Sequence, residues 1–188
     1  SGVATGFNRL DELTSGWQPS DLVILAARPG MGKTAFVMSM AKNMAIDFDT
    51  PVAIFSLEMS SVQLITRMIS SETGISSGKL RKGNLEPHEW EQLNVKVKNL
   101  SKAPIFIDDT PSLSIFDLRA KARRLASQHG IKVIVIDYLQ LMTAGSSSGG
   151  NREQEISTIS RNLKALAKEL AIPAVSYTHL TLPTIYSV

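Results

Sequence analysis

The sequence predicts an α/β fold in which a mostly parallel sheet is flanked by helices on both faces. The first observation is a set of four short apolar runs, rich in β-branched residues, at residues 22–26, 51–56, 104–107 and 132–137. Such runs are typical of strands buried on both faces, as in a parallel sheet. Between them, apolar residues recur every three or four positions, which predicts amphipathic helices. With 188 residues, 43% of them hydrophobic, the chain suits one domain with a layered core.

The second observation is a phosphate loop at residues 27–34, between the first expected strand and the first long helix. Its glycines permit positive φ, so that consecutive N–H groups can point at phosphate oxygens, and the following helix adds the positive end of its dipole. In this motif the lysine reaches the β- and γ-phosphates and the next hydroxyl binds Mg²⁺. Ala27 replaces the glycine that opens the strict motif, and the alternative is an ordinary glycine-containing turn. We expect ATP and Mg²⁺ to bind here, through Arg28, Pro29, Gly30, Met31, Gly32, Lys33 and Thr34.

The third observation is the acidic residue Asp137, which follows the apolar run Val-Ile-Val-Ile. This is the Walker B pattern, in which a buried strand presents a carboxylate at its tip. Paired with a phosphate loop earlier in the chain, it predicts a magnesium site made by Thr34 and Asp137.

Two further strands also end in acidic residues. Ligands of open parallel sheets bind outside the carboxyl ends of the strands, so Glu58 is expected to face the same crevice as Lys33. Glu58 is a candidate general base that orients the water attacking the γ-phosphate; the alternative is an exposed acid near the start of the next helix. Asp108 and Asp109 could form a metal site, but the sequence Asp-Asp-Thr-Pro favours a turn and a helix cap.

The helices are bounded by recognisable signals. Residues 1–19 are expected to form a short helix between turns that braces the pocket, and residues 79–83 an exposed basic turn. Ser60 and Ser114 are expected N-caps, and Pro87 opens another helix. Trp90, Leu93 and Val97 are expected to lie on one side of that helix.

A Gly/Ser-rich segment at residues 143–151 follows the Walker B strand. Such a loop at the functional end of a sheet is either an idle linker or a place for substrate contacts, and Arg152 stands at its exit. The helix beyond it has an apolar stripe of Ile156, Ile159, Leu163, Leu166 and Leu170.

The composition indicates the cellular compartment in which the chain is expected to work. The chain has no cysteine, which excludes disulfides and thiolate metal sites and favours a reducing cytoplasm. Its apolar runs are too short to span a membrane, and the N-terminus has no signal-peptide core. The formal charge of +3 is compatible with a nucleic-acid partner without requiring one. Because the chain begins at Ser1 without Met, we expect it to be part of a longer protein.

Together these motifs resemble the C-terminal motor domain of DnaB-type replicative DNA helicases, a hexameric branch of the RecA-like ATPases. The resemblance rests on TGF at 5–7 with LD at 10–11, AARPGMGKT at 26–34, SLEMS at 56–60, DYLQLM at 137–142 and ISRNLKALAKEL at 159–170. It implies a RecA-like P-loop NTPase domain over residues 1–175, incomplete at its C-terminus.

The resemblance also implies roles for the site residues. Glu58 would be the catalytic base, Lys33 and Thr34 would hold phosphate and Mg²⁺, and Asp137 would complete the metal site. The loop after Asp137 would face a central channel in which single-stranded DNA passes, with Arg152 as a candidate DNA contact. Members of the family assemble as rings, expected here to be hexameric, and associate with primase and a helicase loader.

The pattern breaks near the C-terminus. In the family, the strand beginning at Ile172 continues into Ser-Gln-Leu-Asn, whose Gln senses the γ-phosphate, whereas this chain reads Ser-Tyr-Thr-His-Leu from Ser176. We therefore predict that residues 176–188 are a tail foreign to the family, similar to translated cloning or sequencing-adapter material, and that His179 has no role in catalysis or metal binding. Without the sensor and the arginine finger of a neighbouring subunit, the chain is expected to bind nucleotide but turn it over slowly.

Two other functions stay open at this point. A RecA-fold ATPase of the recombinase or circadian-clock type also begins with Thr-Gly-Phe-x-x-Leu-Asp, as residues 5–11 do here. A truncated chain could also be an ATP-binding module without turnover.

Overall fold

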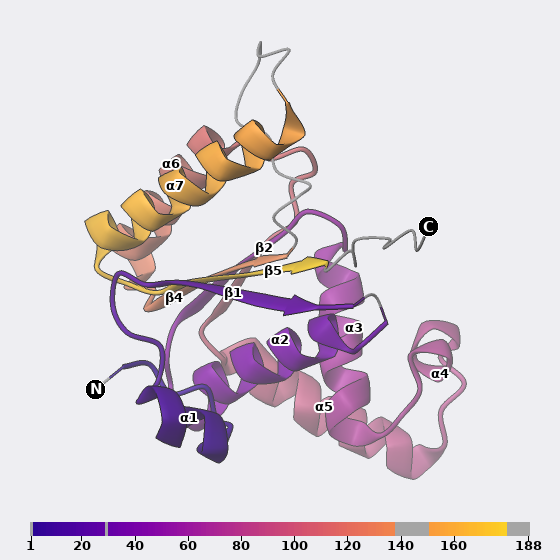
Figure 1. The fold of residues 1–188 in the computed structure, drawn as a ribbon. Helices are drawn as coiled ribbons and strands as arrows, with labels where there is room; N and C mark the ends of the chain where they lie inside the picture. Colours follow the sequence, from indigo (N-terminus) through magenta and orange to yellow (C-terminus); the bar gives the residue numbers. More distant parts are fainter. Residues whose placement is uncertain (1, 29, 138–150, 180–188) are drawn as a thin grey trace, which may run out of the picture.

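The computed structural model describes residues 2–28, 30–137 and 151–179 (Figure 1). In chain order the elements are α1 (Asn8–Thr14), β1 (Leu22–Ala27), α2 (Lys33–Lys42), the π-helical turn η1 (Asn43–Asp47), β2 (Val52–Ser56), α3 (Ser61–Thr73), α4 (Ser77–Lys82), α5 (Pro87–Lys102), β3 (Ile105–Asp108), α6 (Ile115–His129), β4 (Val133–Asp137), α7 (Arg152–Leu170) and β5 (Ala174–His179).

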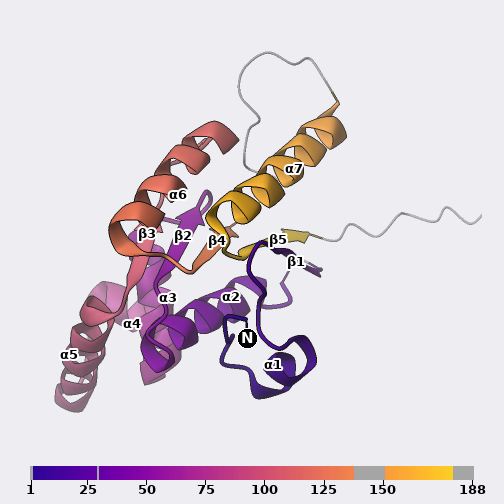
Figure 2. The same ribbon diagram turned by 90° about the vertical axis from the view of Figure 1, so that its left-hand side faces the viewer.

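The five strands form one parallel sheet in the order β1-β5-β4-β2-β3. Figure 2 shows α6 and α7 on one face and α1 and α2 on the other, where α3 and α5 also lie. The predicted α/β fold with helices on both faces is confirmed. Because all five strands run in the same direction, their carboxyl ends lie along one edge of the sheet. The phosphate loop begins at this edge, where β1 ends.

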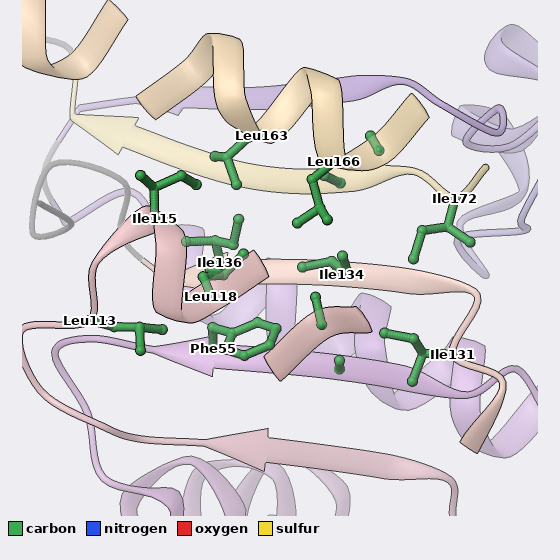
Figure 3. Packing of buried hydrophobic residues seen from close by; sticks show 14 of the residues in the cluster. Phe55, Leu113, Ile115, Leu118, Ile131, Ile134, Ile136, Leu163, Leu166 and Ile172 are labelled. Carbon is green, nitrogen blue, oxygen red and sulfur yellow. The ribbon is translucent and has the colours of Figure 1, made fainter. Parts of the chain in front are cut away.

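The core on the α6 and α7 face is built from alternate strand residues, since successive side chains of a strand point to opposite faces. Ile134 and Ile136 of β4 point to this face and pack with Phe55 of β2. Figure 3 shows Leu118 of α6 and Leu163 of α7 closing over them. The predicted stripe on α7 is confirmed, with Ile159, Leu163 and Leu166 fully buried and Ile156 and Leu170 packed at its margins.

The N-terminal segment packs on α2, the helix that begins in the phosphate loop. Phe7 stacks on Phe36 with ring centroids 4.8 Å apart, and the indole N–H of Trp17 donates to the sulfur of Met40 at 3.2 Å. Gly6 has φ +82° and lies so close to the start of η1 that an added Cβ would meet the Asn43 side chain. Residues 1–19 therefore brace the helix that begins in the phosphate loop, and through it the site at which the sequence predicts nucleotide binding.

Helix signals in the sequence correspond to observed caps. Ser60 accepts from the backbone N–H of Gln63, whose side chain accepts from Ser60 N, which completes a capping box. Ser114 accepts from the backbone N–H of Asp117, and Pro87 occupies the first position of α5.

One expectation about the α3 to α5 region is wrong. Residues 79–83 are not a plain turn: most of them belong to α4, which Ser76 caps by accepting from Lys79 N. The side of α5 that contains Trp90 and Val97 stays partly open to solvent, since each of these residues is 45% exposed. The reason is tertiary, because α5 packs against α3 and buries no residue fully.

The core prediction can be tested at α7. Leu163→Ala should lower the free energy of unfolding by about 2 to 5 kcal/mol, because it removes fully buried methyl groups and leaves a cavity. Urea unfolding followed by circular dichroism would measure this. Ser157→Ala, on the exposed face of the same helix, should change stability by less than about 0.5 kcal/mol. Equal losses in the two variants would contradict the assigned orientation of α7.

Candidate active site

The phosphate loop joins the end of β1 to the start of α2. Gly30 and Gly32 have φ of +77° and +76°, and a Cβ added to either would meet nothing within 4 Å. The positive φ, and not crowding, is therefore what requires glycine at both positions. Gly32 is the N-cap of α2 and provides no side-chain acceptor for the first-turn amides, a helix start suited to bind an anion. Pro29 lies outside the described residues.

Lys33 reaches across the edge of the sheet. Its Nζ donates to the carbonyl oxygens of Ala27 at 3.0 Å and Thr178 at 2.7 Å, which lie at the ends of β1 and β5. Burial lowers the pKa of Lys33 from its ordinary value. Beside it a cavity of about 260 Å³ is lined by Leu25, Ala26, Ala27, Met31, Gly32, Lys33 and Phe36. Arg28 and Met31 are exposed at the rim of the loop.

Thr34 and Asp137 converge from different elements. Asp137, 1% exposed, lies at the tip of β4, and Thr34 lies in the first turn of α2. Tyr177 of β5 lies against both: its hydroxyl is 3.4 Å from the Thr34 hydroxyl, and burial together with the Asp137 carboxylate raises its pKa. The sequence did not point to Tyr177, because it falls in the segment assigned to a foreign tail.

The donors at this point fit a magnesium ion. A Thr hydroxyl and a carboxylate are oxygen ligands, which Mg²⁺ prefers, and it is commonly held by one or two carboxylates together with substrate phosphates. Among the described residues, no group of three or more His, Cys, Asp or Glu could hold a metal. Thr34 and Asp137 supply two oxygen ligands, which suits an ion whose other ligands come from a bound nucleotide.

Glu58 lies just beyond β2, next to this pair. Ser56, the last residue of β2, is opposite Asp137 in the sheet, and the N–H of Leu57 donates to the Asp137 carbonyl at 2.7 Å. Glu58 is exposed, and its charge contributes to raising the pKa of Tyr177. The structure therefore brings Glu58, Asp137, Thr34 and Lys33 to one edge of the sheet.

The acidic pair at the end of β3, Asp108 and Asp109, has the turn chemistry that the sequence favours. Asp108 accepts from the backbone N–H of Thr110 at 3.0 Å and from Lys121 Nζ at 2.7 Å. Asp109 accepts from the backbone N–H of Ser61, the first residue of α3, at 2.8 Å. Both carboxylates are therefore engaged in a turn and a helix start, as predicted.

Arg152 is the first residue of α7 and forms an ion pair with Glu155. The predicted DNA-facing loop lies outside the described residues, apart from Asn151, so the structure does not relate Arg152 to it. Residues 176–179 form the last four residues of β5, and residues 180–188 lie outside the described part. The foreign origin of residues 176–188 stays a prediction.

Comparison with known proteins agrees with this geometry. The sequence profile of the family described as DnaB-like helicase C terminal domain matches residues 2–182. The replicative DNA helicase DnaB of Geobacillus stearothermophilus is 51% identical over 181 residues, which are 96% of this chain and 40% of that protein. The replicative DNA helicase DnaC of Bacillus subtilis (strain 168) is 46% identical over 181 residues, again 96% and 40%.

Solved structures show the same fold. A DnaB-like replicative helicase, studied with its interactions with primase, has a TM-score of 0.88 at 34% identity, and the match covers 96% of this chain and 44% of that one. A second solved structure, of an ATPase domain, has a TM-score of 0.89 at 34% identity, covering 96% and 64%.

The chain spans about two fifths of the length of the Geobacillus and Bacillus relatives. The described residues include no helix long and apolar enough to cross a membrane. The profile and the names of the relatives favour the helicase family over the recombinase and clock-type ATPases that share its opening motif. From its sequence match, its fold and the arrangement of its phosphate loop, this chain belongs to the family of DnaB-like helicase C-terminal domains.

Proposed function

We propose that this chain is the motor of a replicative DNA helicase, which couples ATP hydrolysis to translocation on single-stranded DNA and to duplex unwinding. The observation that carries the proposal is the convergence of Lys33, Thr34, Asp137 and Glu58 at one edge of the sheet. These residues supply a phosphate-binding cation, two oxygen ligands for a metal and a carboxylate near the place where the γ-phosphate would lie.

Each side chain has a distinct role in the proposed reaction. Lys33 binds the β- and γ-phosphate oxygens, and Thr34 and Asp137 hold Mg²⁺, which neutralises phosphate charge when bound. Glu58 accepts a proton from water as the water oxygen bonds to the γ-phosphorus. The bond from that phosphorus to the bridging oxygen breaks, and ADP leaves with the electron pair.

The proposal extends to DNA and to other subunits. Single-stranded DNA would be held mainly through its phosphates, with Arg152 among the contacts. We further propose a homo-oligomeric, hexameric ring with ATP at the subunit interfaces, and association with primase and a helicase loader in the cytoplasm. Family membership supports this extension.

A second candidate is an ATP-binding module without turnover. The observation that favours it is Tyr177, whose phenol lies against both proposed magnesium ligands. The two candidates differ in whether bound ATP is hydrolysed, which the Glu58 variant below tests.

The role of Lys33 predicts a loss of nucleotide binding. Lys33→Ala should weaken binding of a fluorescent ATP analogue by about 10- to 100-fold, because it removes charged hydrogen bonds worth about 1.5 to 3 kcal/mol. The matched control is Lys42→Ala, at the other end of α2, where the lysine pairs with Glu72. Comparable effects of the two substitutions in an equilibrium titration would argue against a phosphate-binding role.

The role of Glu58 predicts a loss of hydrolysis with binding retained. Glu58→Gln should lower the single-turnover hydrolysis rate by about 10²- to 10⁴-fold, because the amide cannot accept the proton of the attacking water. Labelled ATP with the chain in excess would be used, since an arginine finger worth about 10³ to 10⁵ in rate would come from a neighbouring subunit. An unchanged rate would rule out Glu58 as the base, and binding without hydrolysis in the parent chain would favour the module.

The role of Arg152 predicts a change in salt dependence. Arg152→Ala should reduce the slope of log K against log salt by about 0.7 for a single-stranded oligonucleotide, because one phosphate contact is lost. Arg124→Ala, at an exposed position of α6, serves as the control. Fluorescence anisotropy between low and moderate salt would measure both slopes, and identical slopes would remove Arg152 from the DNA site.

A further inference from the structure

We infer that Asp109 is a positioning residue for Glu58, because it holds the first turn of α3 and so fixes the segment from which the Glu58 side chain extends. The inference rests on the proposed role of Glu58 as the general base. Asp109 acts through the backbone of Ser61 and not by contact with the reacting atoms.

The sheet brings Asp109 to this place. In the parallel pairing of β2 with β3, Phe55 is opposite Asp108, so the chain leaves both strands at the same edge. Asp109 Oδ2 accepts from the N–H of Ser61 at 2.8 Å, across 48 positions of sequence. Ser61 begins α3 and comes three residues after Glu58.

Hydrogen bonds hold the backbone on both sides of Glu58. Four N–H groups next to it donate to four separate acceptors: Leu57 to the Asp137 carbonyl at 2.7 Å, Met59 to Ser56 Oγ at 3.3 Å, Ser60 to Gln63 Oε1 at 2.9 Å and Ser61 to Asp109. The first three acceptors belong to β4, β2 and α3. The bond to Asp109 adds a connection to the residue that follows β3.

Asp109 is itself held from α6. Lys121 Nζ donates to Asp108 Oδ2 at 2.7 Å and to Thr110 Oγ1 at 2.8 Å, so one ammonium fixes the residues on both sides of Asp109. The hydrogen bond from Ser61 lowers the pKa of Asp109, so the acceptor is ionised at neutral pH. An ionised acceptor makes the stronger, charge-assisted kind of hydrogen bond and also suits a helix N-terminus.

The consequence for catalysis is geometric. Displacement of a catalytic group by about 1 Å can cost about 10²-fold in rate, so loosening the segment of Glu58 should slow hydrolysis. The phosphate loop lies on other elements, at the end of β1 and the start of α2. Loss of Asp109 is therefore expected to change the rate and not the nucleotide affinity.

The test compares five variants with the parent chain: Asp109→Ala, Asp109→Asn, Glu58→Gln, the double variant of Asp109→Ala with Glu58→Gln, and Glu89→Ala. Glu89 is the matched control, because it accepts the backbone N–H of Glu86 at 3.0 Å at the start of α5. Three quantities are measured: affinity for a fluorescent ATP analogue, single-turnover hydrolysis of labelled ATP, and amide hydrogen exchange of peptides covering residues 57–61.

We expect Asp109→Ala to lower the rate about tenfold and to speed exchange at residues 57–61, with affinity unchanged. Asp109→Asn should restore most of the rate, because its amide oxygen can still accept from Ser61. In the Glu58→Gln background the Asp109 substitution should have no further effect on rate. Glu89→Ala should leave both the rate and this exchange unchanged.

The outcomes separate the inference from the proposed function. If Glu58→Gln slows hydrolysis while Asp109→Ala changes neither the rate nor the exchange, the positioning role is wrong and the general base stands. If Asp109→Ala slows hydrolysis equally with and without Glu58, Asp109 acts on something else and the inference is overturned. If Glu58→Gln has no effect, the proposed base itself is wrong.

Discussion

The parallel pairing of β4 with β2 on one side and β5 on the other determines where the functional groups of this chain lie. A parallel strand places its carboxyl end beside that of its neighbour, so residues that follow different strands meet without any local sequence relationship. The pairing of β4 with β2 places Asp137 beside Ser56. The pairing of β4 with β5 places Asp137 close to Tyr177. Fully buried β-branched residues on both faces of β4 hold this pairing in place.

The same constraint explains how the phosphate loop is supported. Lys33 bonds to backbone oxygens at the ends of β1 and β5, so its position depends on two strands that are neighbours in the sheet. On the opposite side, α2 is braced by the stacking of Phe7 on Phe36 and by Trp17 against Met40. The loop itself contributes glycines with positive φ, and the rigid elements on either side supply its orientation.

Local features could be predicted from the sequence, and features that depend on distant partners could not. The phosphate loop, the capping residues Ser60 and Ser114 and the stripe on α7 follow from short patterns. The exposure of Trp90 depends on how α5 packs against α3, which the periodicity of α5 alone does not reveal. The bond from Ser61 to Asp109 and the contacts of Tyr177 depend on strand order, and residues far apart in the sequence make them.

The neighbouring positions of β1 and β5 have a consequence for how the protein is made. Lys33 and Thr178 are 145 residues apart in the chain, and β1 pairs within the sheet with β5, the last strand described. A ribosome synthesises the chain from its N-terminus, so β1 and the phosphate loop emerge before β5. Until β5 emerges, β1 lacks its partner strand and Lys33 lacks the Thr178 carbonyl. Long-range pairing of this kind is slow to form, so the nucleotide pocket would mature late in synthesis. A nascent chain that stops before β5 would expose the edge of β1 that β5 covers in the described sheet, and this edge could pair with other unfinished chains.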